Sequence, residues 1–246
     1  MSVRYGARSR PATMVSTWLN DLDGTTPQLA GYFGGGNNGI TTVNKFAFAD
    51  DSRTTLGTGL STAVRNLAGF ANSGTAGYFA GGGDGVTSYT TVNKFAFADD
   101  SRTTLGTGLS ATSDHFAGMA NSGTAGYAGG IGTGFTATVN KFAFSDDGRT
   151  TLGTGLSAST YSVSAMANSG TAGYFGGGRV STTKVTTVDK FAFSDDGRTT
   201  LGTGLSAGRE ALAGAANSGT AGYFAGGTTG SAVTTVDKFA FSDDGR

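Results

Sequence analysis

A near-identical repeat of about 48 residues is the feature that most constrains the fold of this chain. Two short motifs recur five times each, at spacings of 46 to 49 residues: Gly-Tyr at Gly31, Gly77, Gly126, Gly173 and Gly222, and Lys-Phe-Ala-Phe at Lys45, Lys94, Lys141, Lys190 and Lys238. A period of this length is typical of a four-stranded propeller blade. The repeat is rich in Thr, Gly, Phe, Tyr and Val and lacks helix-forming stretches. We therefore predict an all-β chain that forms a five-bladed β-propeller.

Each repeat contains four strand-like runs separated by turn residues. In the second copy the predicted strands are residues 68–71, 76–81, 91–97 and 103–109. Asn-Ser-Gly-Thr separates the first two, and Asp-Asp-Ser-Arg separates the last two. The small first strand suits the crowded centre of a propeller, and the paired Phe residues of the third strand suit the wider space between blades farther out.

The chain contains one outer strand fewer than the fold needs. The motif Thr-Leu-Gly-Thr-Gly-Leu occurs four times, and the sequence stops where a fifth copy would begin. We predict that residues 1–8 supply the missing strand and close the ring, and that residues 14–19 form the inner strand of the first blade. The expected blades span about 12–60, 61–109, 110–156, 157–205 and 206–246 of a single domain.

Composition excludes several classes of protein. Formal net charge is zero, with 17 basic and 17 acidic residues spread along the chain, so no basic block favours nucleic acid or an anionic membrane. Cysteine is absent, which rules out disulfides and Cys-based metal sites. The N-terminus lacks the apolar segment of a secretory signal. We expect no membrane insertion and a location on a virion or other extracellular particle, or otherwise in the cytoplasm.

The repeat resembles the kelch family of propellers. The resemblance rests on a Gly doublet after the second strand and an aromatic residue on the third, from Gly35-Gly36 and Phe46 in the first copy to Gly226-Gly227 and Phe239 in the last. The Trp that the family carries on the fourth strand is Leu here, at Leu56, Leu105, Leu152 and Leu201. The amino-acid sequence of the repeat is also similar to Gly-rich propeller arrays in structural proteins of viruses that infect cyanobacteria. These resemblances imply a propeller fold and a structural or binding role.

Differences between the copies concentrate in two windows. One follows the Gly doublet, and the other follows the Leu-Ser that ends each repeat. Connections in an antiparallel blade alternate between its two ends, so both windows should lie on one face of the disc and both invariant turns on the other. A rigid scaffold with varied loops is typical of a recognition surface. Neutral drift of exposed loops, with the invariant turns held by their geometry, is the alternative.

The variable windows contain the candidate ligand-binding residues. They are aromatic, planar or charged side chains that can stack on a sugar or hydrogen-bond its hydroxyls, and they suit a protein surface equally. The predicted set is Asn38, Arg65, Asn66, Asp84, Tyr89, Asp114, His115, Phe135, Tyr161, Arg179, Lys184, Arg209 and Glu210. We expect them to recognise a host surface glycan or envelope protein.

Catalysis has little support in the sequence. The one histidine, His115, adjoins Asp114, a pairing that is common at surfaces, and neither a nucleophile motif nor a phosphate loop is present. Repeated Asp pairs suggest calcium, but their spacing lacks the alternating ligands of an EF-hand. We interpret them as hairpin turns in which Asp caps local N–H groups and the following Arg balances the charge. No cofactor, metal or catalytic residue is predicted. The alternatives are an architectural propeller that packs in a particle or filament, possibly as a homo-oligomer, and a kelch-type enzyme.

Overall fold

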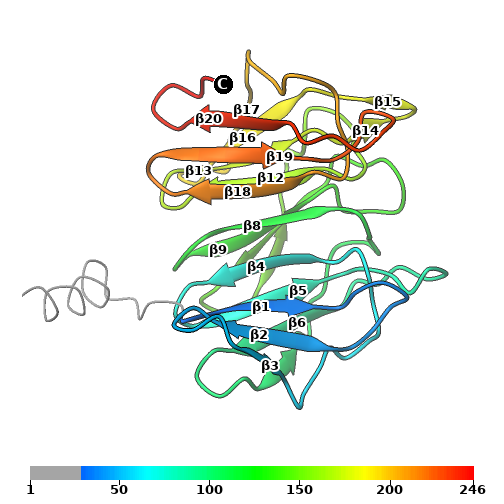
Figure 1. Ribbon diagram of the computed structural model, residues 1–246, viewed down its shortest axis with the longest axis vertical. Helices are drawn as coiled ribbons and strands as arrows, with labels where there is room; N and C mark the ends of the chain where they lie inside the picture. The colour runs from blue at the N-terminus through cyan, green and yellow to red at the C-terminus, as the bar shows by residue number, and fades with distance from the viewer. Residues whose placement is uncertain (1–28) are drawn as a thin grey trace, which may run out of the picture.

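The chain is a five-bladed, all-β propeller, as the repeat predicts. The computed structural model describes residues 29–246, which contain antiparallel sheets and no helix, so no membrane-spanning helix occurs among them. The blades follow one another in chain order from blade 1 at one end of Figure 1 to blade 5 at the other. Blades 2, 3 and 4 have four strands each, whereas the described parts of blades 1 and 5 have three.

The strands occupy equivalent positions in every blade. The inner strands are β4 (Ala68–Asn72), β8 (Ala117–Asn121), β12 (Ser164–Asn168) and β18 (Ala213–Asn217). The second strands are β1 (Ala30–Gly34), β5 (Ala76–Ala80), β9 (Ala125–Gly129), β13 (Ala172–Gly176) and β19 (Ala221–Ala225). The third strands are β2 (Val43–Ala47), β6 (Val92–Ala96), β10 (Val139–Ala143), β16 (Val188–Ala192) and β20 (Val236–Ala240). The outer strands are β3 (Arg53–Thr55), β7 (Arg102–Thr104), β11 (Arg149–Thr151) and β17 (Arg198–Thr200). A small hairpin, β14 (Arg179–Val180) and β15 (Thr183–Lys184), lies in a loop of blade 4.

Within residues 29–246, the first three strands of the repeat form where the sequence predicts them, but the fourth is shorter. The strand expected over 103–109 ends at Thr104. Pairing with the third strand is interrupted after the Leu105 N–H donates to the Val92 carbonyl, and it resumes when Leu109 N–H donates to the Thr90 carbonyl. A side chain on Gly108 would overlap the Thr90 carbonyl, so the Gly-Thr-Gly segment bulges and passes close to the third strand.

The predicted ring closure falls on residues outside the described range. Both the closing strand at 1–8 and the first inner strand at 14–19 precede residue 29. Of the described residues, those of β18 are exposed along the whole strand, and Phe33 and Phe48 of blade 1 are 64% and 63% exposed. If the ring closes as predicted, β18 and Phe33 would be covered at a seam between blade 5 and blade 1, and closure remains a prediction.

Successive blades are joined by a contact that the repeat reproduces at each described interface. The Tyr78 hydroxyl of blade 2 donates to Asp147 of blade 3 at 2.7 Å, and the Lys94 ammonium donates to the other oxygen of the same carboxylate at 2.8 Å. We call this the Tyr–Lys–Asp contact. It recurs as Tyr32 and Lys45 with Asp100, Tyr127 and Lys141 with Asp196, and Tyr174 and Lys190 with Asp244.

The tyrosine of each contact is also held by ring packing. Tyr78 stacks on Phe144 of the next blade with ring centroids 5.3 Å apart, and Lys94 Nζ lies 5.6 Å from the Tyr78 centroid. Burial, followed by the hydrogen bond to Asp147, raises the pKa of Tyr78 above its ordinary value. A raised folded-state pKa means that this stabilisation is complete below the ordinary tyrosine pKa of about 10 and is lost as pH rises further.

The two residues of each Asp pair have different roles. Asp146 Oδ1 accepts from the Gly148 N–H at 2.8 Å and caps the turn, as the sequence predicts. Asp147 adopts a left-handed backbone conformation, with φ of 58°, and makes the contact to the preceding blade. The predicted charge balance by the following Arg is wrong: Arg102 instead donates to the Gly59 carbonyl of the preceding blade at 2.7 Å.

Large inner-strand side chains form a second kind of interface by packing onto glycines of the next blade. Phe70 of β4 covers Gly126 of β9, and a Cβ added to that glycine would overlap the ring. The same arrangement places Met119 over Gly173 and Met166 over Gly222. At these three interfaces the glycine of the Gly-Tyr motif is therefore required, because the preceding blade occupies the space that its side chain would take.

Replacing Asp147 with Asn tests the Tyr–Lys–Asp contact. Asn tolerates the left-handed backbone but removes the charge that both donors share, so we expect the free energy of unfolding to fall by about 1–3 kcal/mol. Asp114→Asn is the matched control: its side chain is 29% exposed against 24% for Asp147, and its nearest side-chain partner is the adjacent His115 in the same blade. Urea unfolding measures both variants, and equal losses would contradict the role of Asp147.

Replacing Gly126 with Ala tests the packing of Phe70. The added methyl has no space beside the ring, so we expect a loss of about 1–3 kcal/mol in unfolding free energy. Gly153→Ala is the control, because nothing lies within 4 Å of the position that its added methyl would take, and its effect should stay within about 0.5 kcal/mol. In a Phe70→Leu background the cost of Gly126→Ala should shrink; an unchanged cost would contradict the overlap.

Candidate ligand-binding face

Hydrogen bonds between loops confirm that the two variable windows share one face. Arg65, in the connection from blade 1 to blade 2, exchanges two backbone hydrogen bonds with Gly83 of the loop between β5 and β6. On the opposite side, Phe97 N–H donates to the Thr75 carbonyl and so joins the third strand's end to the turn between β4 and β5. We call the first surface the loop face, formed by residues 35–42, 60–67, 82–91, 109–116, 130–138, 156–163, 177–187, 205–212 and 226–235, and the other the turn face.

Side chains link neighbouring blades on the turn face. Asn72 Oδ1 accepts from the Gly123 N–H of the next blade at 2.9 Å, and Ser122 Oγ accepts from the Ser73 N–H at 3.0 Å. The same bonds recur from Asn121 to Gly170 and Asn168 to Gly219, and between Ser122 and Ser169 and between Ser169 and Ser218. The Asn-Ser-Gly turns therefore need these side chains, which accounts for their invariance.

Backbone groups make the corresponding links on the loop face. Four equivalent residues in the inter-blade connections, Asn66, His115, Ser162 and Ala211, have φ between 54° and 57°. His115 N–H donates to the Asn66 carbonyl at 3.1 Å, and Ser162 N–H donates to the His115 carbonyl at 2.8 Å. Because the bonds use only backbone atoms, the side chains at these positions are free to differ between blades.

Tyr161 is the centre of an aromatic cluster on the loop face. His115 stacks on its ring with centroids 4.8 Å apart, and the Phe135 ring lies 5.9 Å away in a tilted arrangement. The Arg179 guanidinium lies 5.5 Å from the Tyr161 centroid and 5.6 Å from that of Phe135. Tyr161 and Arg179 also exchange two backbone hydrogen bonds of 2.9 Å, so the loops of blades 3 and 4 hold the cluster together.

Charged groups of both signs surround these rings. Glu210 forms ion pairs with Arg179 and Lys184, with N–O distances of 3.3 and 3.4 Å, while an Asp114 carboxylate oxygen lies 3.1 Å from His115 Nδ1. Burial, then the Asp114 carboxylate, raises the pKa of Tyr161, and Arg179 opposes this effect. The hydroxyl therefore remains protonated at neutral pH and can donate a hydrogen bond to a ligand.

A second group of predicted residues lies in the loop between β5 and β6. Asp84 Oδ1 accepts from the Thr87 and Val86 N–H groups at 2.7 and 2.8 Å, and its Oδ2 accepts from the Tyr89 hydroxyl at 2.8 Å. These bonds lower the pKa of Asp84 to about 2, with the Thr87 N–H as the largest cause. Asp84 thus shapes its own loop and remains ionised.

Arg65 borders a small cavity beside this loop. The cavity has a volume of about 140 Å³ and is lined by Gly83, Gly85, Val86, Thr87, Ser88, Asp114 and Arg65 itself. A Cβ on Gly85 would lie 2.8 Å from the Arg65 guanidinium, so this glycine makes room for the side chain. Residue-type reasoning missed Gly85, although the variation of its loop among copies points to the region.

The structure thus gathers most of the predicted residues and separates two. Asn66, Asp114, His115, Phe135, Tyr161, Arg179, Lys184 and Glu210 form one cluster, and Arg65, Asp84 and Tyr89 lie in the loop beside it. Asn38 is exposed on blade 1, away from these contacts, in a left-handed conformation. The prediction that Arg209 lies on the exposed face is wrong. Its side chain is fully buried, donates to the Gly226 and Thr235 carbonyls, and pairs with Asp237.

Comparison with known proteins adds no family to this description. No protein-family model matches the sequence, and no curated protein gives a significant match. Within residues 29–246, no three or more His, Asp or Glu side chains are grouped so that they could hold a metal ion. The class of the protein is therefore given by its fold, a five-bladed β-propeller with two chemically distinct faces.

Titration of Asp84 tests the proposed structure of its loop. Its folded-state pKa is depressed, so its stabilisation is present above the ordinary Asp pKa of about 3.9 and is lost as pH falls toward about 2. We expect an NMR titration midpoint of about 2 in the folded protein. Tyr89→Phe should raise the midpoint while leaving it below the value in urea. A folded-state midpoint equal to that in urea would contradict the hydrogen bonds.

Proposed function

We propose that this protein is a non-enzymatic binding module whose loop face recognises a host surface glycan or envelope protein. The observation that supports it best is the aromatic cluster around Tyr161, which brings together loops of blades 3 and 4 on the variable face. Phe135 is 40% exposed, and the His115 and Arg179 side chains are 34% and 36% exposed. Exposed rings beside hydrogen-bonding charges suit a sugar ring or a polar protein surface.

The balance of charge supports a neutral or mixed ligand. Arg179 and Lys184 share Glu210, and Asp114 accompanies His115, so the cluster has no large excess of either sign. Formal net charge of the chain is also zero. Long-range attraction to a polyanion therefore has no source here, and recognition would depend on contacts at short range.

The wider setting is part of the same proposal. A virion-associated propeller, on a tail or on the surface of a particle, would bring this face to a host envelope. The support is the similarity of the repeat to viral propeller arrays and the varied loops. An architectural role through the turn face has weaker support, because the invariant Asn and Ser side chains there already bond to neighbouring blades.

Binding measurements with matched variants test the proposal. The purified chain is applied to a glycan array and to envelope preparations from cyanobacteria, and bound protein is quantified. Tyr161→Ala and Arg179→Ala should each weaken binding about tenfold, the value of one stacking or cation–π contact. Asp50→Ala alters an exposed carboxylate on the turn face and should leave binding unchanged.

Two outcomes would contradict the proposal. One is an absence of binding to both the array and the envelope by a chain whose circular dichroism shows that it is folded. The other is binding that Asp50→Ala abolishes and Tyr161→Ala does not affect, because that result would place the interaction on the turn face.

A further inference from the structure

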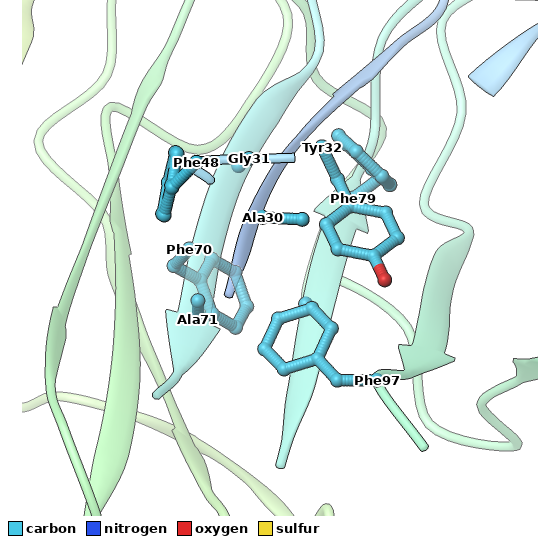
Figure 2. A pocket seen from close by; sticks show the side chains of 10 residues that line it. Ala30, Gly31, Tyr32, Phe48, Phe70, Ala71, Phe79 and Phe97 are labelled. Carbon is cyan, nitrogen blue, oxygen red and sulfur yellow. The ribbon is translucent and has the colours of Figure 1, made fainter. Parts of the chain in front are cut away.

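An apolar cavity lies at the interface between blade 1 and blade 2. It has a volume of about 380 Å³ and is lined mainly by apolar side chains and glycines: Ala30, Gly31, Tyr32 and Phe48 of blade 1, and Gly69, Phe70, Ala71, Gly77, Phe79 and Phe97 of blade 2. Figure 2 shows the side chains of Tyr32, Phe48, Phe70 and Phe97 around this space. A dry cavity of about 150 Å³ already admits a benzene ring, so this one has room for a large aromatic side chain.

The equivalent position is filled at the next three interfaces. Phe70 covers Gly126, Met119 covers Gly173 and Met166 covers Gly222, each from the inner strand of the preceding blade. Gly77 is the corresponding glycine of blade 2. The nearest described atom to a Cβ placed there is a Phe97 ring carbon at 3.2 Å, and that ring belongs to the same blade. Within residues 29–246, Gly77 therefore lacks the inner-strand side chain that Gly126, Gly173 and Gly222 receive from the preceding blade.

The sequence before residue 29 contains a matching side chain. Aligning residues 16–20, Ser-Thr-Trp-Leu-Asn, with β4, Ala-Gly-Phe-Ala-Asn, places Trp18 opposite Phe70 and Asn20 opposite Asn72. In the described blades the residue at this position pairs with the tyrosine of the second strand, as Phe70 pairs with Tyr78 and Met119 with Tyr127. By the same register, Trp18 would pair with Tyr32, which lines the cavity.

We infer that Trp18 fills the cavity between blades 1 and 2 and packs onto Gly77. The occupant is a segment of this chain, which links the two blades in the way that Phe70 links blades 2 and 3. With Trp18 in this apolar cavity, residues 14–19 would form part of the packed propeller. This inference concerns the fold and is independent of the ligand proposed for the loop face.

The fluorescence of the wild-type chain tests the inference without any substitution. Trp18 is the single tryptophan of the chain, so all indole emission reports on it. We expect blue-shifted emission and several-fold weaker acrylamide quenching in the folded protein than in urea. Emission typical of water-exposed indole in folded protein would overturn the inference. A blue shift that disappears on dilution would also overturn it, because the cavity would then be filled by another copy.

Substitutions test whether the Trp18 indole packs onto Gly77. Gly77→Val places a side chain in the proposed position of the indole and should shift the emission to the red while circular dichroism still shows a folded protein. Gly153→Val is the control, since its side chain meets open space, and it should leave the emission unchanged. Trp18→Phe, which copies Phe70, should retain most of the thermal stability that Trp18→Ala loses. Equal melting temperatures for Trp18→Ala and wild type would overturn the inference.

Discussion

One carboxylate in a left-handed backbone conformation joins each pair of described neighbouring blades. Asp147 exemplifies it: the turn holds φ at 58°, and the two carboxylate oxygens accept from Tyr78 and Lys94 of the preceding blade. Hydrogen bonds to a charged acceptor are among the stronger polar interactions, and partial burial reduces their screening by solvent. Because the repeat supplies both donors and acceptor in every copy, the same contact sets the orientation of each blade relative to the next.

The two faces of the propeller differ in how they connect the blades. Side chains of Asn72 and Ser122 make the links on the turn face, so a substitution there removes a bond. Backbone groups of Asn66, His115 and Ser162 make the links on the loop face, so substitution leaves the bonds in place. This difference gives a physical reason why variation collects on one face. It lets the loop-face sequence change without loss of these bonds between blades.

The fold can be predicted well from the sequence because the same pattern of strands and turns occurs in five copies. The length of the repeat and its turn residues predict the blades and three of the four strands. The alternation of connections between the two ends of a blade predicts that the two variable windows share a face. The outer strand is shorter than predicted because a close backbone approach at Gly108 cannot be seen from propensity. The Tyr–Lys–Asp contact escapes prediction, although its residues are invariant, because it joins residues from different repeats that lie 53 to 70 positions apart.

The candidate site could be predicted only in part. Variation among copies predicted Tyr161, Phe135 and Arg179 as ligand-binding residues, and the structure brings the three side chains into one cluster. Arg209 belongs to the same window and yet is buried, because its position in the connection points inward, as do the equivalent Val64, Ser113 and Thr160. A window of variable sequence does not show which of its residues face solvent, and only the register of each loop decides that.

The seam between blades 5 and 1 offers the most direct test of how the ring is held together. Asp51, Tyr223 and Lys238 occupy the positions of a fifth Tyr–Lys–Asp contact, and within residues 29–246 they form none. A double-mutant cycle with Lys238→Met and Asp51→Asn measures their coupling, with Lys94→Met and Asp147→Asn as the reference pair. If the same contact closes the ring, we expect similar coupling at both pairs, on the order of 0.5–3 kcal/mol. Coupling at the reference pair with none at the seam would contradict a closed ring of this kind.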